Sequence, residues 1–209
     1  MLRRTLFPLL LRRIRVEGIE QLPRPPFIIV ANHNSYLDAP MIGASLATRF
    51  GQKSYWLTHA KITRFFGPLI GIRWLGMIPV PHDGNKAKVL EISAEKINQG
   101  NCVGIFPEGH RNFDSQKLRP AKTGAVRLAC LTGAPIVPTG IISPPTITTG
   151  QALRTFFLTD TMLGVRFGEP IHYPKRSLEG VTKNELEQMT KEVMIAVGRL
   201  CHKSYPYAE

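Results

Sequence analysis

The chain has 209 residues, of which 43% are hydrophobic and 20% are charged. That length suits one domain, and the apolar fraction is ample for a buried core, so a disordered chain is excluded. Lysine and arginine outnumber aspartate and glutamate by 27 to 15, which gives a formal net charge of +12. This charge predicts an anionic partner: a membrane surface, a nucleic acid or an acidic soluble molecule. Three widely spaced cysteines without a Cys-x-x-Cys pair predict reduced, buried thiols and a protein that faces the cytosol.

The first fifteen residues combine leucines with arginines. The apolar run from Leu6 to Leu11 is too short to cross a bilayer, and arginines follow it where a secretory signal would have a cleavage site. We therefore expect residues 1–15 to form a basic amphipathic segment in the membrane interface, and residues 16–209 to form a single globular domain. The alternative is a helix that packs on the domain with its arginines in water.

Short apolar runs then alternate with stretches of helical periodicity. Strands are expected at 27–31, 54–58, 76–80, 102–106, 135–142 and 163–167, and helices at 38–47, 83–99, 121–132 and 182–200. This order predicts an α/β domain with a mixed, largely parallel sheet flanked by helices. The apolar segment 62–80 is broken by arginine, glycine and proline, so it is not predicted to span a membrane. It is predicted to line an apolar groove, to contact lipid or to be part of the buried core.

Polar residues follow the first buried strand. In Asn32-His33-Asn34-Ser35-Tyr36-Leu37-Asp38, a tight turn can place the Asp38 carboxylate beside the His33 imidazole. Such a carboxylate fixes the tautomer of the ring and stabilises its protonated form, which suits a general base acting on a hydroxyl. The alternative is an aspartate that caps the following helix.

A second polar stretch, Phe106 to Asn112, follows the 102–106 strand. Glu108 offers an acceptor for a hydroxyl, Arg111 offers a fork of donors for a phosphate, and Gly109 permits close approach of a ligand to the backbone. Taken alone, the same residues suit a Glu–Arg pair that holds a turn together.

These two stretches together resemble motifs of the glycerolipid acyltransferase family, of the 1-acyl-sn-glycerol-3-phosphate acyltransferase type. Asn-His-x-x-x-x-Asp matches 32–38, Phe-Pro-Glu-Gly-x-Arg followed by Asn matches 106–112, and an apolar run ending in Val-Pro matches 136–138. The segment 16–23 also resembles the strand that precedes the first motif. The resemblance extends from about Val16 to Pro170 in the family's order.

The resemblance implies transfer of a fatty acyl group from acyl-CoA or acyl-acyl carrier protein to the free sn-2 hydroxyl of 1-acyl-sn-glycerol-3-phosphate, which makes phosphatidate in phospholipid biosynthesis. His33 and Asp38 would be catalytic, and Glu108, Gly109, Arg111 and Asn112 would bind the acceptor. The thioester brings its own activation, so neither a metal nor another cofactor is expected. His82 stands where the family's second motif normally has an arginine, and we expect it to bind the acceptor in that place, with Arg73 or Lys86 as substitutes.

The implied partners are a phospholipid surface, the lysophospholipid acceptor and the acyl donor. We expect a peripheral or monotopic enzyme on the cytoplasmic face of a membrane. The basic residues Lys117, Arg119 and Lys122 are either solvated or in contact with phosphate. No aromatic-rich basic strand or recognition helix indicates a nucleic-acid partner. Two alternatives stay open: another acceptor, such as glycerol 3-phosphate or an amino-lipid, and a degenerate, membrane-peripheral lipid-binding protein.

Overall fold

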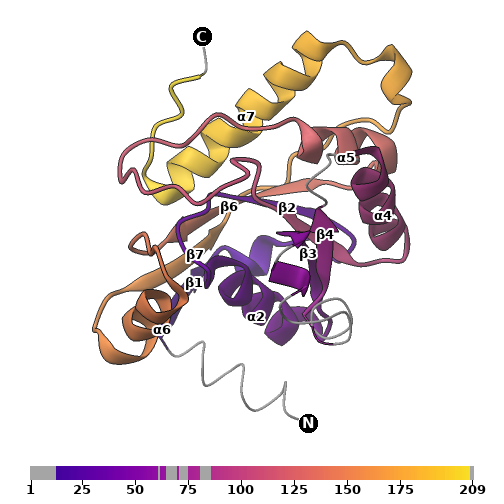
Figure 1. The fold of residues 1–209 in the computed structure, drawn as a ribbon. Helices are drawn as coiled ribbons and strands as arrows, with labels where there is room; N and C mark the ends of the chain where they lie inside the picture. The colour runs from indigo at the N-terminus through magenta and orange to yellow at the C-terminus, as the bar shows by residue number, and fades with distance from the viewer. Residues whose placement is uncertain (1–12, 61, 65–69, 71–74, 81–85, 208–209) are drawn as a thin grey trace.

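The computed structural model describes residues 13–60, 62–64, 70, 75–80 and 86–207 (Figure 1). These residues form a seven-stranded sheet in the order β1-β7-β6-β2-β5-β3-β4. The strands are β1 (Ile14–Glu17), β2 (Ile28–Ala31), β3 (Ser54–His59), β4 (Met77–Val80), β5 (Cys102–Ile105), β6 (Ile136–Ile142) and β7 (Leu163–Phe167). The helices are η1 (Ile19–Gln21), α2 (Asp38–Phe50), α4 (Lys86–Asn98), α5 (Gly124–Thr132), α6 (Thr149–Leu158), η3 (Leu178–Gly180) and α7 (Lys183–Cys201).

The sheet is mixed and largely parallel, as the sequence predicts. Neighbouring strands run parallel except at one place, where β6 and β7 are antiparallel. β2 lies between β5 and β6 and is buried along its whole length, as expected of a central strand with both faces covered. The carboxyl ends of β2, β5 and β6 therefore meet at one edge of the sheet.

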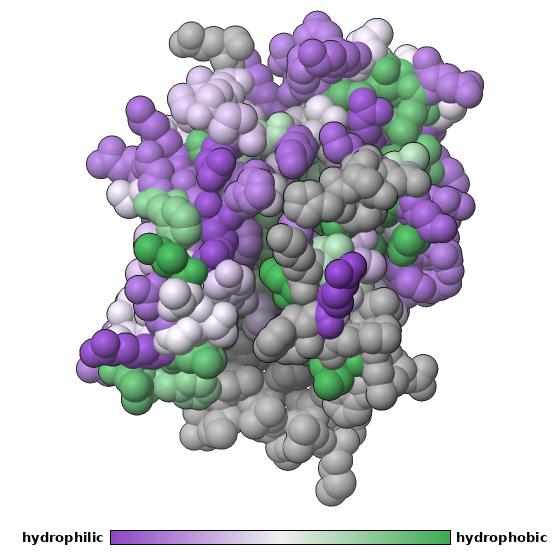
Figure 2. Space-filling model, viewed as in Figure 1, coloured by the Kyte–Doolittle hydropathy of each residue, from purple (hydrophilic) through white to green (hydrophobic). Residues whose placement is uncertain are grey.

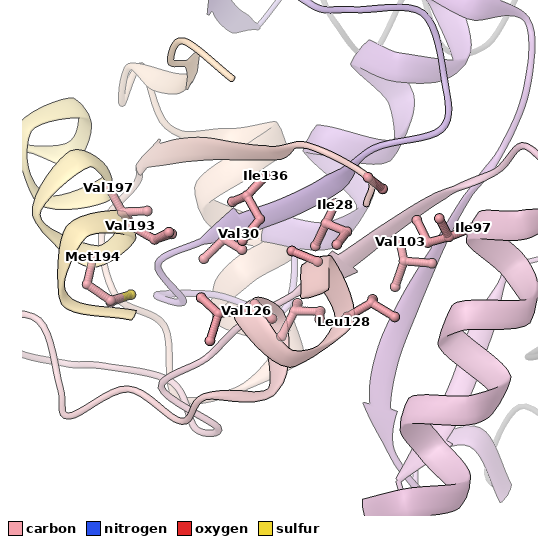
Figure 3. Packing of buried hydrophobic residues seen from close by; sticks show 14 of the residues in the cluster. Ile28, Val30, Ile97, Val103, Val126, Leu128, Ile136, Val193, Met194 and Val197 are labelled. Carbon is pink, nitrogen blue, oxygen red and sulfur yellow. The ribbon is translucent and has the colours of Figure 1, made fainter. Parts of the chain in front are cut away.

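Helices cover both faces of the sheet. Figure 1 shows α4, α5 and α7 on one side, and α2 and α6 on the other. Successive side chains of a strand point to opposite faces, so β2 contributes Ile28 and Val30 to one core and Ile29 and Ala31 to the other. Figure 3 shows Val30 and Ile136 of the sheet lying among side chains of α5 and α7. Burial on both faces holds the central strands, and therefore the loops that follow them, in fixed positions.

Two details of the helices differ from the expectation. In the sequence, the spacing of Ala87, Leu90, Ala94 and Ile97 predicts that they form the buried face of the helix at 83–99. Ile97 is buried, and Leu90 and Ala94 pack partly buried against the core, but Ala87 is exposed, and the other buried residues of α4 are Val89 and Ser93. The buried stripe of Val89, Ser93 and Ile97 has a spacing of four residues, and apolar periodicity does not indicate the polar Ser93. This serine can be buried because its hydroxyl donates to the Val89 carbonyl oxygen at 2.7 Å.

The other difference is α6, which the sequence analysis did not predict. This helix begins with a capping box, in which Thr148 accepts from the backbone of Gln151 and Gln151 accepts from the backbone of Thr148. The capping box predicted for the last helix, Thr182 with Glu185, is confirmed. Among the helices that the structure describes, none has the length and apolarity needed to cross a bilayer. Residues 1–12 of the segment expected in the membrane interface lie outside the described residues.

Candidate active site

Three loops meet beyond the carboxyl ends of the central strands. The loop after β2 holds His33 to Leu37, the loop after β5 holds Phe106 to Arg119, and the loop after β6 reaches Thr146. Hydrogen bonds between backbone groups join the loops: the Asn112 N–H donates to the His33 carbonyl oxygen at 2.6 Å, and the Thr146 N–H donates to the Asn34 carbonyl oxygen at 3.2 Å. The two sequence motifs, more than seventy residues apart in the chain, therefore form one site.

His33 and Asp38 are paired within the first loop. His33 Nδ1 lies 2.8 Å from Asp38 Oδ2, and the same oxygen accepts the backbone N–H groups of Asn34 at 2.6 Å and Ser35 at 2.8 Å. Asp38 is fully buried, whereas the His33 side chain is 21% exposed. Because the carboxylate accepts at Nδ1, it favours the tautomer in which Nε2 is the proton acceptor. Asp38 is also the first residue of α2, where a negative charge is favoured by the helix dipole.

A stack of aromatic rings fixes the plane of the imidazole. The His33 ring lies over Phe106 with centroids 4.2 Å apart and an angle of 14°, and Phe106 in turn stacks on Trp56 at 5.1 Å. This stack needs a glycine in β5, because a Cβ at Gly104 would lie 2.4 Å from the Trp56 ring. The Trp56 indole N–H donates to Ser54 Oγ at 2.8 Å, so the lowest ring of the stack is held as well.

Glu108 joins the loops rather than facing solvent. Only 4% of this residue is exposed, and its two carboxylate oxygens accept the backbone N–H groups of His33 at 3.0 Å and Arg119 at 2.8 Å. Burial raises the pKa of the Glu108 carboxyl, and the two backbone donors oppose that rise. The carboxylate thus holds the backbone of His33 in place. Its predicted contact with the acceptor stays a prediction.

Arg111 lies at the outer edge of the same loop. Its NH1 donates to the carbonyl oxygens of Thr146 at 2.5 Å and Ile147 at 2.8 Å, and its NH2 donates to the Tyr36 hydroxyl at 3.0 Å. The guanidinium also lies over the Tyr36 ring, 3.9 Å from its centroid. Within the described part of the chain these contacts use three of the five N–H donors of an arginine, so the partly exposed guanidinium keeps donors for an anion.

Gly109 and Asn112 shape the loop around Arg111. Gly109 has a φ of 76°, which glycine adopts without strain, and a Cβ there would lie 2.9 Å from Lys122 Nζ. The buried Asn112 donates to the Lys117 carbonyl oxygen at 2.7 Å and accepts the Asp114 N–H at 3.0 Å. Asn112 therefore folds the loop, and its direct contact with an acceptor stays a prediction. His82 and Arg73 lie outside the described residues, and Lys86 is exposed at the start of α4.

A lysine that no sequence pattern predicted supports the site from the C-terminal side of α7. Lys203, just after α7, donates to Asn34 Oδ1 at 3.0 Å and to the Asp114 carbonyl oxygen at 2.6 Å. Its charge acts on the buried Glu108 in the direction that lowers the pKa of that carboxyl. No local motif marks Lys203, because its role comes only from the packing of α7 against the sheet. Tyr36 was missed as well, since it occupies a free position of the first motif.

The cysteines match the expectation of buried thiols. Cys102, Cys130 and Cys201 are free and buried. Burial raises the pKa of Cys102 to about 12 and that of Cys201 to about 11, so neither is a thiolate at neutral pH. Among the residues that the structure describes, no three His, Cys, Asp or Glu side chains are grouped as metal ligands would be. The expectation that catalysis needs no metal stays a prediction.

The fold and the paired loops define an α/β protein of the acyltransferase class. The family model described as Acyltransferase matches residues 13–142, and the chain belongs to this family. A chloroplastic 1-acyl-sn-glycerol-3-phosphate acyltransferase from Brassica napus is 33% identical over 140 residues, which cover 62% of this chain and 38% of that protein. A 1-acyl-sn-glycerol-3-phosphate acyltransferase from Saccharomyces cerevisiae is 28% identical over 189 residues, or 86% of this chain and 57% of that protein.

A solved structure has the same fold. The crystal structure of the 1-acyl-sn-glycerophosphate acyltransferase PlsC from Thermotoga maritima superposes with a TM-score of 0.61 at 24% identity, over 94% of this chain and 74% of that chain. The predicted α/β architecture is thereby confirmed. The chain spans about two fifths of the Brassica protein and somewhat more than half of the yeast protein.

Proposed function

We propose that this chain transfers a fatty acyl group from an acyl thioester to the free sn-2 hydroxyl of 1-acyl-sn-glycerol-3-phosphate. The observation that supports this most directly is the His33–Asp38 pair at 2.8 Å, held by buried Asp38 beside an arginine-bearing loop. Family membership and the names of the relatives favour the same reaction.

His33 would act as the general base. Its Nδ1 is occupied by Asp38, so Nε2 would take the proton of the sn-2 hydroxyl as that oxygen attacks the thioester carbon. The carbon–sulfur bond then breaks, and the released thiolate takes up a proton, which can come from His33. Asp38 would stabilise the imidazolium during the attack. The step needs no acyl-enzyme, in keeping with thiols that burial keeps protonated.

Arg111 would bind the acceptor phosphate. Two backbone carbonyl oxygens and the Tyr36 hydroxyl hold its guanidinium in one orientation, and a pre-oriented fork loses little entropy when it binds a phosphate. Arg119 is exposed, and its guanidinium donates to the Arg111 carbonyl oxygen at 3.5 Å, so a second cation stands close to this position. Glu108 would contribute by holding the backbones of His33 and Arg119 in register.

The acyl donor would be acyl-CoA or acyl-acyl carrier protein, both of which are anionic and suit a chain of formal charge +12. The acceptor is a membrane lipid, so the enzyme would work at the cytoplasmic face of a membrane as a peripheral or monotopic protein. In this setting the basic N-terminal segment would add to the attraction for anionic lipid. The product, phosphatidate, would enter phospholipid biosynthesis.

An acyl-transfer assay with product analysis tests the proposal. Purified protein would be supplied with lysophosphatidate in detergent and with palmitoyl-CoA or palmitoyl-acyl carrier protein, and products would be identified by mass spectrometry. Phosphatidate formed together with one equivalent of free thiol is the expected result. Transfer to glycerol 3-phosphate or another lysolipid, with none to lysophosphatidate, would instead assign a different acceptor, in line with the histidine at position 82. Thiol release without any acylated product would contradict the proposal.

A further inference from the structure

Helix α6 differs from the other long helices in the residues at its exposed positions. α4 and α7 expose charged residues such as Lys86, Glu91 and Glu187. α6 buries Ala152 and Phe156 on one side but also exposes apolar residues, Leu153, Phe157 and Leu158, the last of them 77% exposed. A surface helix of a protein in water normally carries polar residues at such positions. The apolar stripe of α6 is therefore wider than the side it buries, which indicates a second apolar environment besides the core.

The apolar surface extends from α6 to the candidate active site. Ile147 just before α6 and Met162 just after it are 64% and 66% exposed. The Ile147 carbonyl oxygen accepts from Arg111, and its N–H donates to Gln151 of the α6 cap. The Arg111 guanidinium also lies 5.7 Å from the ring centroid of the exposed Phe113 and stacks on Tyr36. We call this set the apolar rim: Tyr36, Phe113, Ile147, Leu153, Phe157, Leu158 and Met162.

The charges around the rim are mostly positive. Arg111 lies close to two of the rim's three aromatic rings, those of Tyr36 and Phe113. Arg154 is exposed on α6, and Arg13 donates to the Phe156 carbonyl oxygen at 2.6 Å. Two exposed acids lie beside the rim: Asp160, 4.0 Å from Arg13, and Asp114, which follows Phe113 and accepts the backbone N–H groups of Gln116 and Lys117. Figure 2 shows the apolar surface at the lower left, over the end of the molecule where Figure 1 places α6. Exposed leucine and phenylalanine bordered by arginine are the composition of surfaces that enter the headgroup region of anionic membranes.

We infer that the apolar rim is a lipid-contact surface of this protein, with an anionic bilayer as its occupant and α6 as the inserted element. Since Arg111 bonds to the residues that lead into α6, insertion of the helix would place the guanidinium at the level of the lipid phosphates. This would present the candidate site to an acceptor that is still in the membrane. Only the presentation of the site to a membrane-bound acceptor rests on the proposed function. Contact of the apolar rim with lipid can be measured without any substrate.

A single labelled cysteine tests the inference in the full chain. The native cysteines are buried, so an exposed cysteine introduced as Leu158→Cys can be labelled selectively with an environment-sensitive nitrobenzoxadiazole dye. We expect its emission to shift to the blue when vesicles of phosphatidylcholine and phosphatidylglycerol are added, and less with phosphatidylcholine alone. The same dye at Glu187→Cys, exposed on α7, should not shift.

Vesicle sedimentation of unlabelled variants provides the second readout. The double variant Phe157→Ser with Leu158→Ser should bind anionic vesicles at least about tenfold more weakly, whereas Tyr207→Ser, an exposed apolar residue near the C-terminus, should bind like the wild type. Wild-type binding by the double variant would overturn the inference. So would a blue-shifted dye in monomeric protein without vesicles, which would mean that this chain covers the rim itself, or a shift that appears only as protein concentration rises, which would assign the rim to a second copy. Vesicle contact together with failed acyl transfer would refute only the proposed function.

Discussion

The substitution Asp38→Asn removes the negative charge of this side chain but keeps its shape, so it tests whether catalysis depends on the charge. Asp38 Oδ2 accepts three donors: the His33 ring at 2.8 Å and the backbone N–H groups of Asn34 at 2.6 Å and Ser35 at 2.8 Å. The oxygen of an asparagine amide can take the same place and accept the same three bonds. The turn is therefore kept in Asp38→Asn, while the negative charge beside the imidazolium is lost.

The structure sets the size of the expected effect. Two opposite unit charges about 4 Å apart attract by about 4 kcal/mol at an effective dielectric constant of about 20, and a neutral hydrogen bond retains about 1 kcal/mol of this. A loss of about 3 kcal/mol corresponds to about a 10²-fold fall in kcat. The amide nitrogen would take the place of Asp38 Oδ1, which is buried and has no partner among the described residues, so stability should fall by about 1–3 kcal/mol.

The assay compares the kcat of acyl transfer and urea unfolding for the wild type and Asp38→Asn. Asp38→Ala is the matched control, because it also leaves the N–H groups of Asn34 and Ser35 without an acceptor and should unfold more easily than Asp38→Asn. A kcat of Asp38→Asn within about threefold of the wild type would refute the electrostatic role of Asp38.

Three further substitutions test the loops around the site. Burial raises the pKa of the Glu108 carboxyl above its ordinary 4.5, so the folded chain binds this proton more tightly than the unfolded chain. The free energy of unfolding that protonated Glu108 contributes is therefore lost as the pH rises from 4.5 through the raised pKa. Glu108→Gln should flatten this decline when urea unfolding is measured at a series of pH values, and an unchanged slope would contradict the assignment. Gly109→Ala should cost about 1–2 kcal/mol in thermal unfolding, since alanine is strained at a φ of 76°. Lys203→Met should cost about 1–2 kcal/mol by removing two bonds to the loops, whereas Lys183→Met on the exposed start of α7 should cost nothing measurable.

The order of strands and helices could be predicted from the sequence because the central strands are buried on both faces. β2, β5 and β6 appear as short apolar runs, and the last helix is marked by its capping box. α6 could not be predicted by the same logic. Its apolar residues do recur at helical spacing, as Ala152 with Phe156 and Leu153 with Phe157. The stretch is only ten residues long, however, and it opens with Thr149 and Gly150, which are poor helix formers, so no strong local preference marks it as a helix.

The pairing of the two motifs could be predicted because both follow parallel strands that end at one edge of the sheet. The roles of individual residues within these two motifs could not be predicted in the same way. A motif shows that Glu108 is present, but only the fold shows both of its oxygens bonded to the backbone of other loops. Lys203 lies 169 residues from its partner Asn34, and a contact at that separation depends on how α7 packs, which no local pattern encodes.

The initial rate of acyl transfer by His33→Ala, measured beside His110→Ala, tests the central claim most directly. His110 is an exposed histidine at the free position of the motif from Phe106 to Asn112, next to Arg111, so it controls for loss of a histidine in the same region. The account predicts a fall of about 10²–10⁴-fold for His33→Ala and a rate close to the wild type for His110→Ala. Equal rates for His33→Ala and the wild type would contradict the assignment of His33 as the base.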